Sequence, residues 1–383
     1  MIKLLKLVWA TTSPQKEFFT TTFIMKFHSA SIMEAENNQG LEWNLNDILT
    51  IDQFDQIFNK IENDLQNFSN FKNQLSEEMS VDLFNQILKA SDNLSKQYTR
   101  LCAFVSLRLS QDIKDQKARA LQNKLDSLSI KIHDATLFFS QWCKGKEVES
   151  LPILDEANAK RLFAASGNFE YSLTYSRNAS IHTLPSDQEK IIHRKDKTGV
   201  DVITELYTMI TNDFTFNFTP SDNEPQTITN QQKLMTFVHS TNPKEREAAY
   251  TALFTPYKQN SDKLFLIYSA VAKDWAEEAT LRNYEDSIAM RHMANKVTKK
   301  AVATLLQVCK ENVSIFQEYF RIKAKILQMP KLRRYDLYAP MELEKQTFSF
   351  EDAQRIVFDS FEKFWPDFKD KAKSIIDQKH IHS

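Results

Sequence analysis

The scarcity of glycine constrains this chain more than any other feature of its sequence. Glycine occurs 4 times in 383 residues, whereas an average chain carries roughly 7% glycine. Glycine adopts positive φ without steric cost, so few positions here suit tight turns or close approach of the backbone to a phosphate. This excludes a Gly-x-Gly-x-x-Gly dinucleotide fold, a P-loop and a sheet-rich fold with many short hairpins. The sequence predicts a mainly α fold of long helices joined by polar loops.

Composition indicates a folded chain and excludes several classes of partner. The chain is 42% hydrophobic and 26% charged, so it can bury a core. Its 49 basic and 50 acidic residues give a net charge of −1, which argues against binding nucleic acid through bulk positive charge. No apolar run reaches about 18 residues, so we expect no membrane partner. Three distant cysteines, Cys102, Cys143 and Cys309, favour a reducing compartment and a cytoplasmic location.

The first 38 residues differ from the rest of the chain. The segment begins with the short, basic and apolar run MIKLLKLVWA, which resembles the start of a signal peptide. The residues that follow offer neither a sustained apolar region nor a clear cleavage site. We expect a poorly ordered extension over residues 1–38, which an upstream start codon could explain because Met25 and Met33 follow.

Helical periodicity dominates the remaining residues and predicts bundles of long helices. Between residues 121 and 142, apolar residues recur at alternating spacings of four and three and form a seam along one helix face. Gly145 should end this helix. Capping patterns indicate other helix starts, at Thr50, at Asn242-Pro243 and at Ser349. Residues 244–328 should form two or three long helices, and Pro366 should bend or end another helix. The apolar seam consists of Leu121, Leu125, Leu128, Ile132, Ala135, Phe139 and Trp142.

One segment alternates as a strand rather than as a helix. Phe214, Phe216 and Phe218 lie on one side of an extended chain, and the turn-forming run Pro220-Ser-Asp-Asn223 follows. We predict an inserted β-hairpin at about residues 213–229, whose phenylalanine face packs on a helix or lines a groove. A short strand is also expected near residues 333–340.

Histidine spacing does not support a metal site in this chain. A helical zinc hydrolase needs two histidines one turn apart, with glutamate after the first as general base. None of the eight histidines is followed by glutamate. His133 is expected to be a helix-surface or seam-flanking residue. The pair His380 and His382 is expected to belong to a polar terminal segment without a nearby carboxylate. Nucleophile signatures such as Gly-x-Ser-x-Gly are missing as well.

Two polar clusters are candidates for a substrate-binding surface. The denser one contains Arg333, Arg334, Tyr335 and Tyr338 within the run from Lys331 to Met341. Such a cluster fits a cleft wall with hydrogen-bonding tyrosines and arginines, and it fits equally a structural strand whose charges pair locally. The second cluster contains Asp274 and Arg282, for which an ion-paired helix end is the simpler interpretation.

Several long segments, in the same order, resemble the oligoendopeptidase F family of thimet-oligopeptidase-like zinc metallopeptidases. The resemblance begins at about residue 41 with Leu-Glu-Trp-Asn-Leu and includes the predicted hairpin. It is densest over residues 246–341, in the segments REAAYTALF, KDWAEEATLRNYEDS, YFRIKAKIL and KLRRYDLYAP. The resemblance implies two helical lobes around a deep channel that admits short unfolded peptides.

The resemblance also implies a zinc site, from which this sequence departs. Family members hold zinc with the two histidines of His-Glu-x-x-His and a later glutamate, and the motif's own glutamate activates water. No such motif is present in these residues. We therefore assign no catalytic or metal residue to this chain and expect it to bind no zinc by itself. The resemblance covers roughly the N-terminal two thirds of a family member.

These observations predict a domain order and two hypotheses for function. Residues 39–190 would form an N-terminal helical domain, and residues 191–383 would form the first part of a zinc-peptidase domain, truncated before its metal motif. In the first hypothesis the chain is the N-terminal portion of a zinc-dependent oligoendopeptidase that cleaves internal bonds of short peptides. Its partners would be short peptides and a missing C-terminal catalytic half. The alternative is a non-catalytic helical scaffold or peptide-binding protein derived from that family.

Overall fold

The computed structural model describes residues 42–148, 151–220, 224–341 and 348–381. The predicted extension over residues 1–38 lies outside these residues. By its internal contacts, the chain divides into two compact units. We call residues 39–199 with 371–383 the N-terminal unit, and residues 200–370 the central unit. Helix α16 (Pro366–Asp377) contains residues of both units. The predicted boundary at residues 190–191 stays a prediction.

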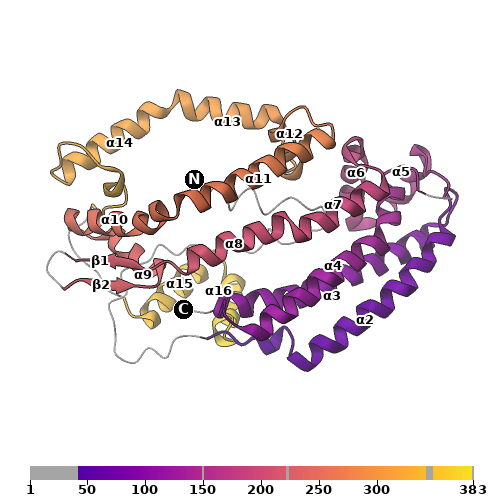
Figure 1. Cartoon of the computed structure of the whole chain (residues 1–383), viewed down its shortest axis with the longest axis horizontal. Coiled ribbons are helices and arrows are strands. Elements are labelled where there is room, and N and C mark those ends of the chain that lie inside the picture. The colour runs from indigo at the N-terminus through magenta and orange to yellow at the C-terminus, as the bar shows by residue number, and fades with distance from the viewer. Residues whose placement is uncertain (1–41, 149–150, 221–223, 342–347, 382–383) are drawn as a thin grey trace. The chain divides into compact units, whose positions relative to one another are not determined.

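Three long helices form the body of the N-terminal unit. These are α2 (Ile51–Ser69), α3 (Val81–Gln111) and α4 (Gln116–Cys143), which lie side by side in Figure 1. The predicted seam is confirmed, because its members from Leu125 to Trp142 face the core of this unit. Shorter elements complete the unit: η2 (Leu45–Asp47), η3 (Asn70–Gln74), α5 (Glu156–Ala164), η4 (Gly167–Phe169), α6 (Glu170–Asn178), η5 (Ala179–His182) and α7 (Ser186–Thr198).

Local chemistry sets the ends of these helices as the sequence predicts. The Thr50 hydroxyl accepts from the Gln53 amide N–H, and the Gln53 side chain accepts from the Thr50 N–H, which completes a capping box for α2. Gly145 adopts φ of +69° just after α4, a conformation that a side chain would strain. Both features let polar loops join the helices without unsatisfied backbone groups.

The central unit begins with α8 (Val200–Asn212) and the predicted hairpin. Strands β1 (Phe216–Phe218) and β2 (Gln226–Ile228) pair antiparallel, with Phe216 opposite Ile228. Phe214, Phe216 and Phe218 are buried together with residues of the helices that follow. The prediction of a hairpin with a packed phenylalanine face is therefore confirmed. Two further elements, α9 (Gln231–Thr236) and η6 (Phe237–His239), lead into the long helices.

The long helical region of the central unit is more divided than the sequence predicted. Five helices occupy residues 243–326, rather than two or three, because polar residues such as Asn312 end one helix and start the next. Asn242 caps the first of them, with Pro243 at its first position as predicted. The five helices are α10 (Pro243–Gln259), α11 (Ser261–Leu281), α12 (Ser287–Ala294), α13 (Lys299–Glu311) and α14 (Val313–Ile326).

The segment after α14 contradicts one prediction. The short strand expected near residues 333–340 is wrong, since these residues contain the 3-10 turn η7 (Arg334–Asp336). The Asp336 carboxylate accepts from the backbone N–H of Arg333, at 3.0 Å, which closes a tight turn instead of an extended chain. Farther on, Ser349 caps α15 (Phe350–Phe364), and α16 begins at Pro366. The predicted interruption at Pro366 is confirmed. Together the helices and the single described hairpin confirm the mainly α fold.

Candidate functional site

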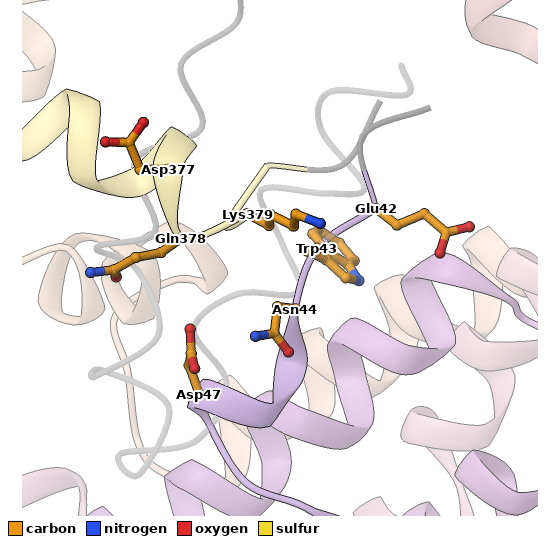
Figure 2. Close-up of a pocket in the computed structure, with 7 residues that line it drawn as sticks. All are labelled: Glu42, Trp43, Asn44, Asp47, Asp377, Gln378 and Lys379. Carbon is orange, nitrogen blue, oxygen red and sulfur yellow. The ribbon is translucent and has the colours of Figure 1, made fainter. Parts of the chain in front are cut away.

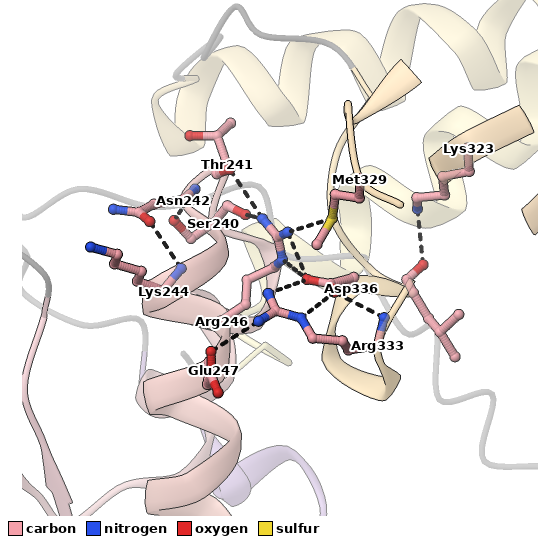
Figure 3. A network of polar contacts seen from close by, with 11 residues as sticks. Ser240, Thr241, Asn242, Lys244, Arg246, Glu247, Lys323, Met329, Arg333 and Asp336 are labelled. Carbon is pink, nitrogen blue, oxygen red and sulfur yellow. Dashed lines mark hydrogen bonds and ion pairs between the residues drawn. The ribbon is translucent and has the colours of Figure 1, made fainter. Parts of the chain in front are cut away.

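The denser predicted cluster is organised around a buried ion pair between α10 and η7. Arg246 comes from the first turns of α10 and is 1% exposed, whereas Asp336 ends η7 and is fully buried. The Asp336 Oδ1 atom accepts from Arg246 Nη2 at 2.8 Å and from Nε at 3.2 Å. The two N–H groups of Arg246 Nη1 donate to the carbonyls of Ser240 and Thr241, at 2.8 and 3.0 Å, and Nη2 also contacts Met329 Sδ at 4.0 Å (Figure 3). A buried guanidinium is thus satisfied on every side.

Arg333 extends this network toward the surface. Its Nε atom donates to Asp336 Oδ2 at 2.8 Å, and its Nη1 donates to Glu247 at 2.9 Å (Figure 3). Burial alone would raise the pKa of Asp336, but the hydrogen bonds from Arg333 and Arg246 hold it below its usual value. The bond to Asp336 also raises the pKa of Arg333. The carboxylate therefore stays charged, and it fixes the turn to α10.

A lysine from α14 secures the far side of the turn. Lys323 is buried, and its Nζ donates to the carbonyl of Leu337 at 2.9 Å. Burial, reinforced by the nearby positive charge of Arg246, lowers the pKa of Lys323. Three elements, α10, η7 and α14, are therefore joined by charged side chains that the sequence separates by up to 90 residues.

The tyrosines of the cluster lie on the outer side of this network. Tyr335 stacks under Arg333, whose Cζ lies 4.4 Å from the ring centroid, and beside Tyr250 at 5.3 Å. Desolvation and a hydrogen bond with Glu247 raise the pKa of Tyr335. Tyr338 is 49% exposed, with Arg334 over its ring at 5.7 Å. The structure therefore brings Arg333, Arg334, Tyr335 and Tyr338 together as one surface.

The second predicted pair is not part of this surface. Asp274 and Arg282 lie toward the end of α11 that leads to α12, whereas α10 adjoins the opposite end of α11 (Figure 1). Arg282 donates from Nε to Glu278 at 2.8 Å, which is the ion-paired helix end that the sequence suggested. Partial desolvation raises the pKa of Asp274. Beside it, the Arg291 guanidinium lies 5.1 Å from the Trp275 ring centroid.

The N-terminal unit contains a separate polar cavity of about 490 Å³. It lies between the segment that precedes α2 and the end of α16 (Figure 2). His380 contacts Asp47 at 3.0 Å, so the expectation that no carboxylate lies near this histidine is wrong. The partner is 333 residues away in sequence, which no local pattern can reveal. The residues that line the cavity are Glu42, Trp43, Asn44, Asp47, Asp377, Gln378 and Lys379.

His133 is a seam-flanking residue, as predicted, with a feature that the sequence did not show. Its imidazole stacks on that of His193 from α7, with ring centroids 4.2 Å apart. Burial lowers the pKa of His133, which favours the neutral ring. The neighbouring Asp134 pairs with Arg194. This arrangement joins α4 to α7 within the N-terminal unit.

Sequence reasoning missed the partners that organise the denser cluster. Arg246, Glu247 and His239 contact the turn from α10 and η6, and nothing in their spacing predicts this. Among the described residues, no group of three or more histidine, cysteine, aspartate or glutamate side chains could hold a metal ion. Within the same residues, no helix combines the length and apolar character needed to cross a bilayer.

Comparisons with known proteins extend these observations. Residues 236–365, which contain the ion-pair network, match the profile of Peptidase family M3. An oligoendopeptidase F homolog from Lactococcus lactis subsp. lactis (strain IL1403) is 22% identical over 270 residues, which is 70% of this chain and 44% of the relative. A homolog from Borreliella burgdorferi is 26% identical over 129 residues, 33% of this chain and 22% of the relative. This chain thus spans less than half the length of the curated relatives it matches.

Solved structures share the fold. Oligoendopeptidase-F from Enterococcus faecium superposes with a TM-score of 0.66 at 18% identity, over 86% of this chain and 67% of that chain. A PZ peptidase A structure with an inhibitor also gives 0.66, at 15% identity, over 84% of this chain and 53% of that one. The profile match, the sequence relatives and the shared fold confirm the predicted resemblance of this chain to the oligoendopeptidase F family.

Proposed function

We propose that this chain is the N-terminal portion of a zinc-dependent oligoendopeptidase that hydrolyses internal bonds of short peptides. The observation that carries the proposal is the Peptidase family M3 match over residues 236–365, which falls within the central unit. The relatives named oligoendopeptidase F supply the substrate class. The three cysteines form no disulfide bond, which supports a reducing, cytoplasmic setting for such an enzyme.

The residues that the structure describes do not fit a catalytic zinc ion. Such a site takes three protein ligands and leaves one position for water. None of the eight histidines is followed by glutamate, and the described residues contain no suitable cluster of three donors. We therefore assign no catalytic step to the residues of this chain. In the proposal, metal ligands and the general base belong to sequence that this chain does not include.

Exposed apolar helix surface supports the idea that further protein packs on the central unit. Helix α13 buries none of its residues, and α14 buries only Lys323 and Ala324. An exposed apolar surface of this size is typical of a face that another segment or chain covers. In the proposal, the missing catalytic half covers it. The largest apolar side chains of this α13–α14 surface are Leu305, Leu306, Val308, Val313, Ile315, Phe316, Tyr319, Ile322 and Ile326, each 45–65% exposed.

Two measurements test this proposal. The purified 383-residue chain is incubated with an internally quenched peptide and zinc, with a chelator-treated sample as control. We expect no zinc-dependent cleavage, and cleavage would refute the claim that the chain lacks its own site. The coding DNA is then read beyond Ser383. We expect an in-frame His-Glu-x-x-His and a downstream glutamate. A stop codon, with no separate reading frame for that half, would favour the scaffold alternative.

A further inference from the structure

The η7 turn presents one arginine to solvent on a rigid support. The turn is held from within by the buried pair of Arg246 and Asp336, and from the α14 side by Lys323. Arg334 is the first residue of η7, directly between the anchored Arg333 and Tyr335. Because its neighbours are fixed, the direction in which the Arg334 side chain leaves the backbone is fixed as well. A preorganised group loses less entropy when it binds a ligand.

Arg334 differs from the other arginines of the network in having no carboxylate partner among the described residues. Asp336 is engaged by Arg246 and Arg333, and Glu247 is engaged by Arg333. Counted with Lys323 and Arg334, the cluster has four cationic side chains. Against these stand the two carboxylates and that of Glu245, which accepts a hydrogen bond from Ser240. Burial is the main cause of the lowered pKa of Lys323, and the positive charge of Arg246 adds to it. An exposed guanidinium in a positive field attracts an anion.

One aromatic ring lies against this guanidinium, and a second ring supports the first. Arg334 lies over the face of Tyr338, with 5.7 Å between Cζ and the ring centroid. His239 packs edge-to-face against the same tyrosine, with centroids 5.9 Å apart and the rings at 63°. A guanidinium that stacks on a ring keeps its N–H edge available, and that edge matches the two oxygens of a carboxylate.

We propose that Arg334, oriented by Tyr338 and His239, is a specificity-determining residue that binds a carboxylate of a peptide ligand. This inference rests on the proposed function, which makes peptides the ligand class. Two sources share the required chemistry: the C-terminal carboxylate of a short peptide, and an acidic side chain within one. A C-terminal anchor would favour short substrates, because it fixes the distance from the chain end to the bond that is cleaved.

The test measures peptide binding to the full 383-residue chain by calorimetry or by NMR titration. The probes are an N-acetylated pentapeptide of alanine and leucine with a free C terminus, its C-terminal amide, and an amidated version containing one glutamate. The variants are Arg334→Ala and Arg334→Lys. Arg321→Ala is the matched control, since Arg321 is an exposed arginine of the same unit that pairs with Glu318. Circular dichroism verifies that every variant folds alike.

We expect amidation to weaken binding about three- to tenfold in the wild type and in R321A. In R334A the free and amidated peptides should bind equally, and R334K should retain part of the preference. If the amidated peptide with glutamate binds more tightly than the plain amide only when Arg334 is present, that result would identify an acidic side chain as a second source of the carboxylate. The inference is overturned if the wild type shows no carboxylate preference, if R334A keeps it, or if no peptide binds. If all peptides bind equally, Arg334 does not select a carboxylate, but peptides remain the ligand class. The zinc assay described above tests the proposed function separately.

Discussion

Replacing Asp336 with asparagine tests the buried network most directly. Asp336 is fully buried and accepts hydrogen bonds from Arg246 and Arg333, while Arg246 is itself 1% exposed. The substitution keeps the size of the side chain and removes its charge. Arg246 would then be a buried cation without a counterion, and the new amide N–H₂ group would face other donors.

The expected loss is large because only one partner of a buried pair is removed. Such changes cost about 3–5 kcal/mol. Arg246 keeps the carbonyls of Ser240 and Thr241, so we expect about 3 kcal/mol, at the lower end of that range. The control is Asp352→Asn, because Asp352 pairs with Arg355 on the surface of α15. Exposed pairs contribute about 0.2–1 kcal/mol, so this variant should unfold almost like the wild type.

The assay is urea unfolding, followed by hydrogen exchange so that the two units are distinguished. Amides of α10 and of residues 333–339 should exchange faster in D336N, and those of α2 to α4 should not change. The pKa of Asp336 is held below its usual value, so its stabilisation is complete above about pH 4. It is lost as the pH falls through the lowered folded-state pKa, and D336N should lack this acid dependence. A loss no greater than that of D352N would refute the argument that this ion pair holds the turn.

Four further substitutions probe three other parts of the fold. Burial lowers the pKa of His133, so the folded state favours the neutral ring, and stability should fall as the pH drops below about 6.5. His133→Phe should remove that dependence in urea unfolding between pH 7.5 and 5.5; an unchanged profile would contradict this. Gly145→Ala should cost about 2 kcal/mol and Gly167→Ala about 1 kcal/mol in thermal unfolding. Both have positive φ, but only at Gly145 would a Cβ meet a guanidinium, that of Arg177 at 3.1 Å. Equal losses would contradict the clash. Phe216→Ala should cost about 3–5 kcal/mol of central-unit stability, because the ring is 1% exposed. A loss below about 1 kcal/mol in urea unfolding would show that the hairpin does not anchor that core.

Features that depend on neighbours in sequence could be predicted. The seam of α4 follows from a spacing of three and four residues, and the capping box at Thr50 follows from a spacing of three. The hairpin follows from alternating phenylalanines before a turn-forming run. The break at Asn312 was missed because an apolar stripe continues across it, so periodicity alone does not show where one helix ends. The strand predicted near residues 333–340 is wrong for a related reason: alternation of charged and aromatic residues also suits a turn closed by Asp336.

By itself, the sequence determined the mainly α class, the helix ends that local capping controls, the hairpin, and the resemblance to the oligoendopeptidase F family. These rest on contacts within a few residues, or on motifs that can be compared directly. Only the tertiary structure showed that Asp336 binds an arginine 90 residues away, and that Asp47 contacts His380. It also separated Asp274 and Arg282 from the other candidates and left Arg334 as the exposed cation beside Tyr338. Long-range pairing depends on how helices pack, and packing is set by the whole core, so no local pattern carries that information.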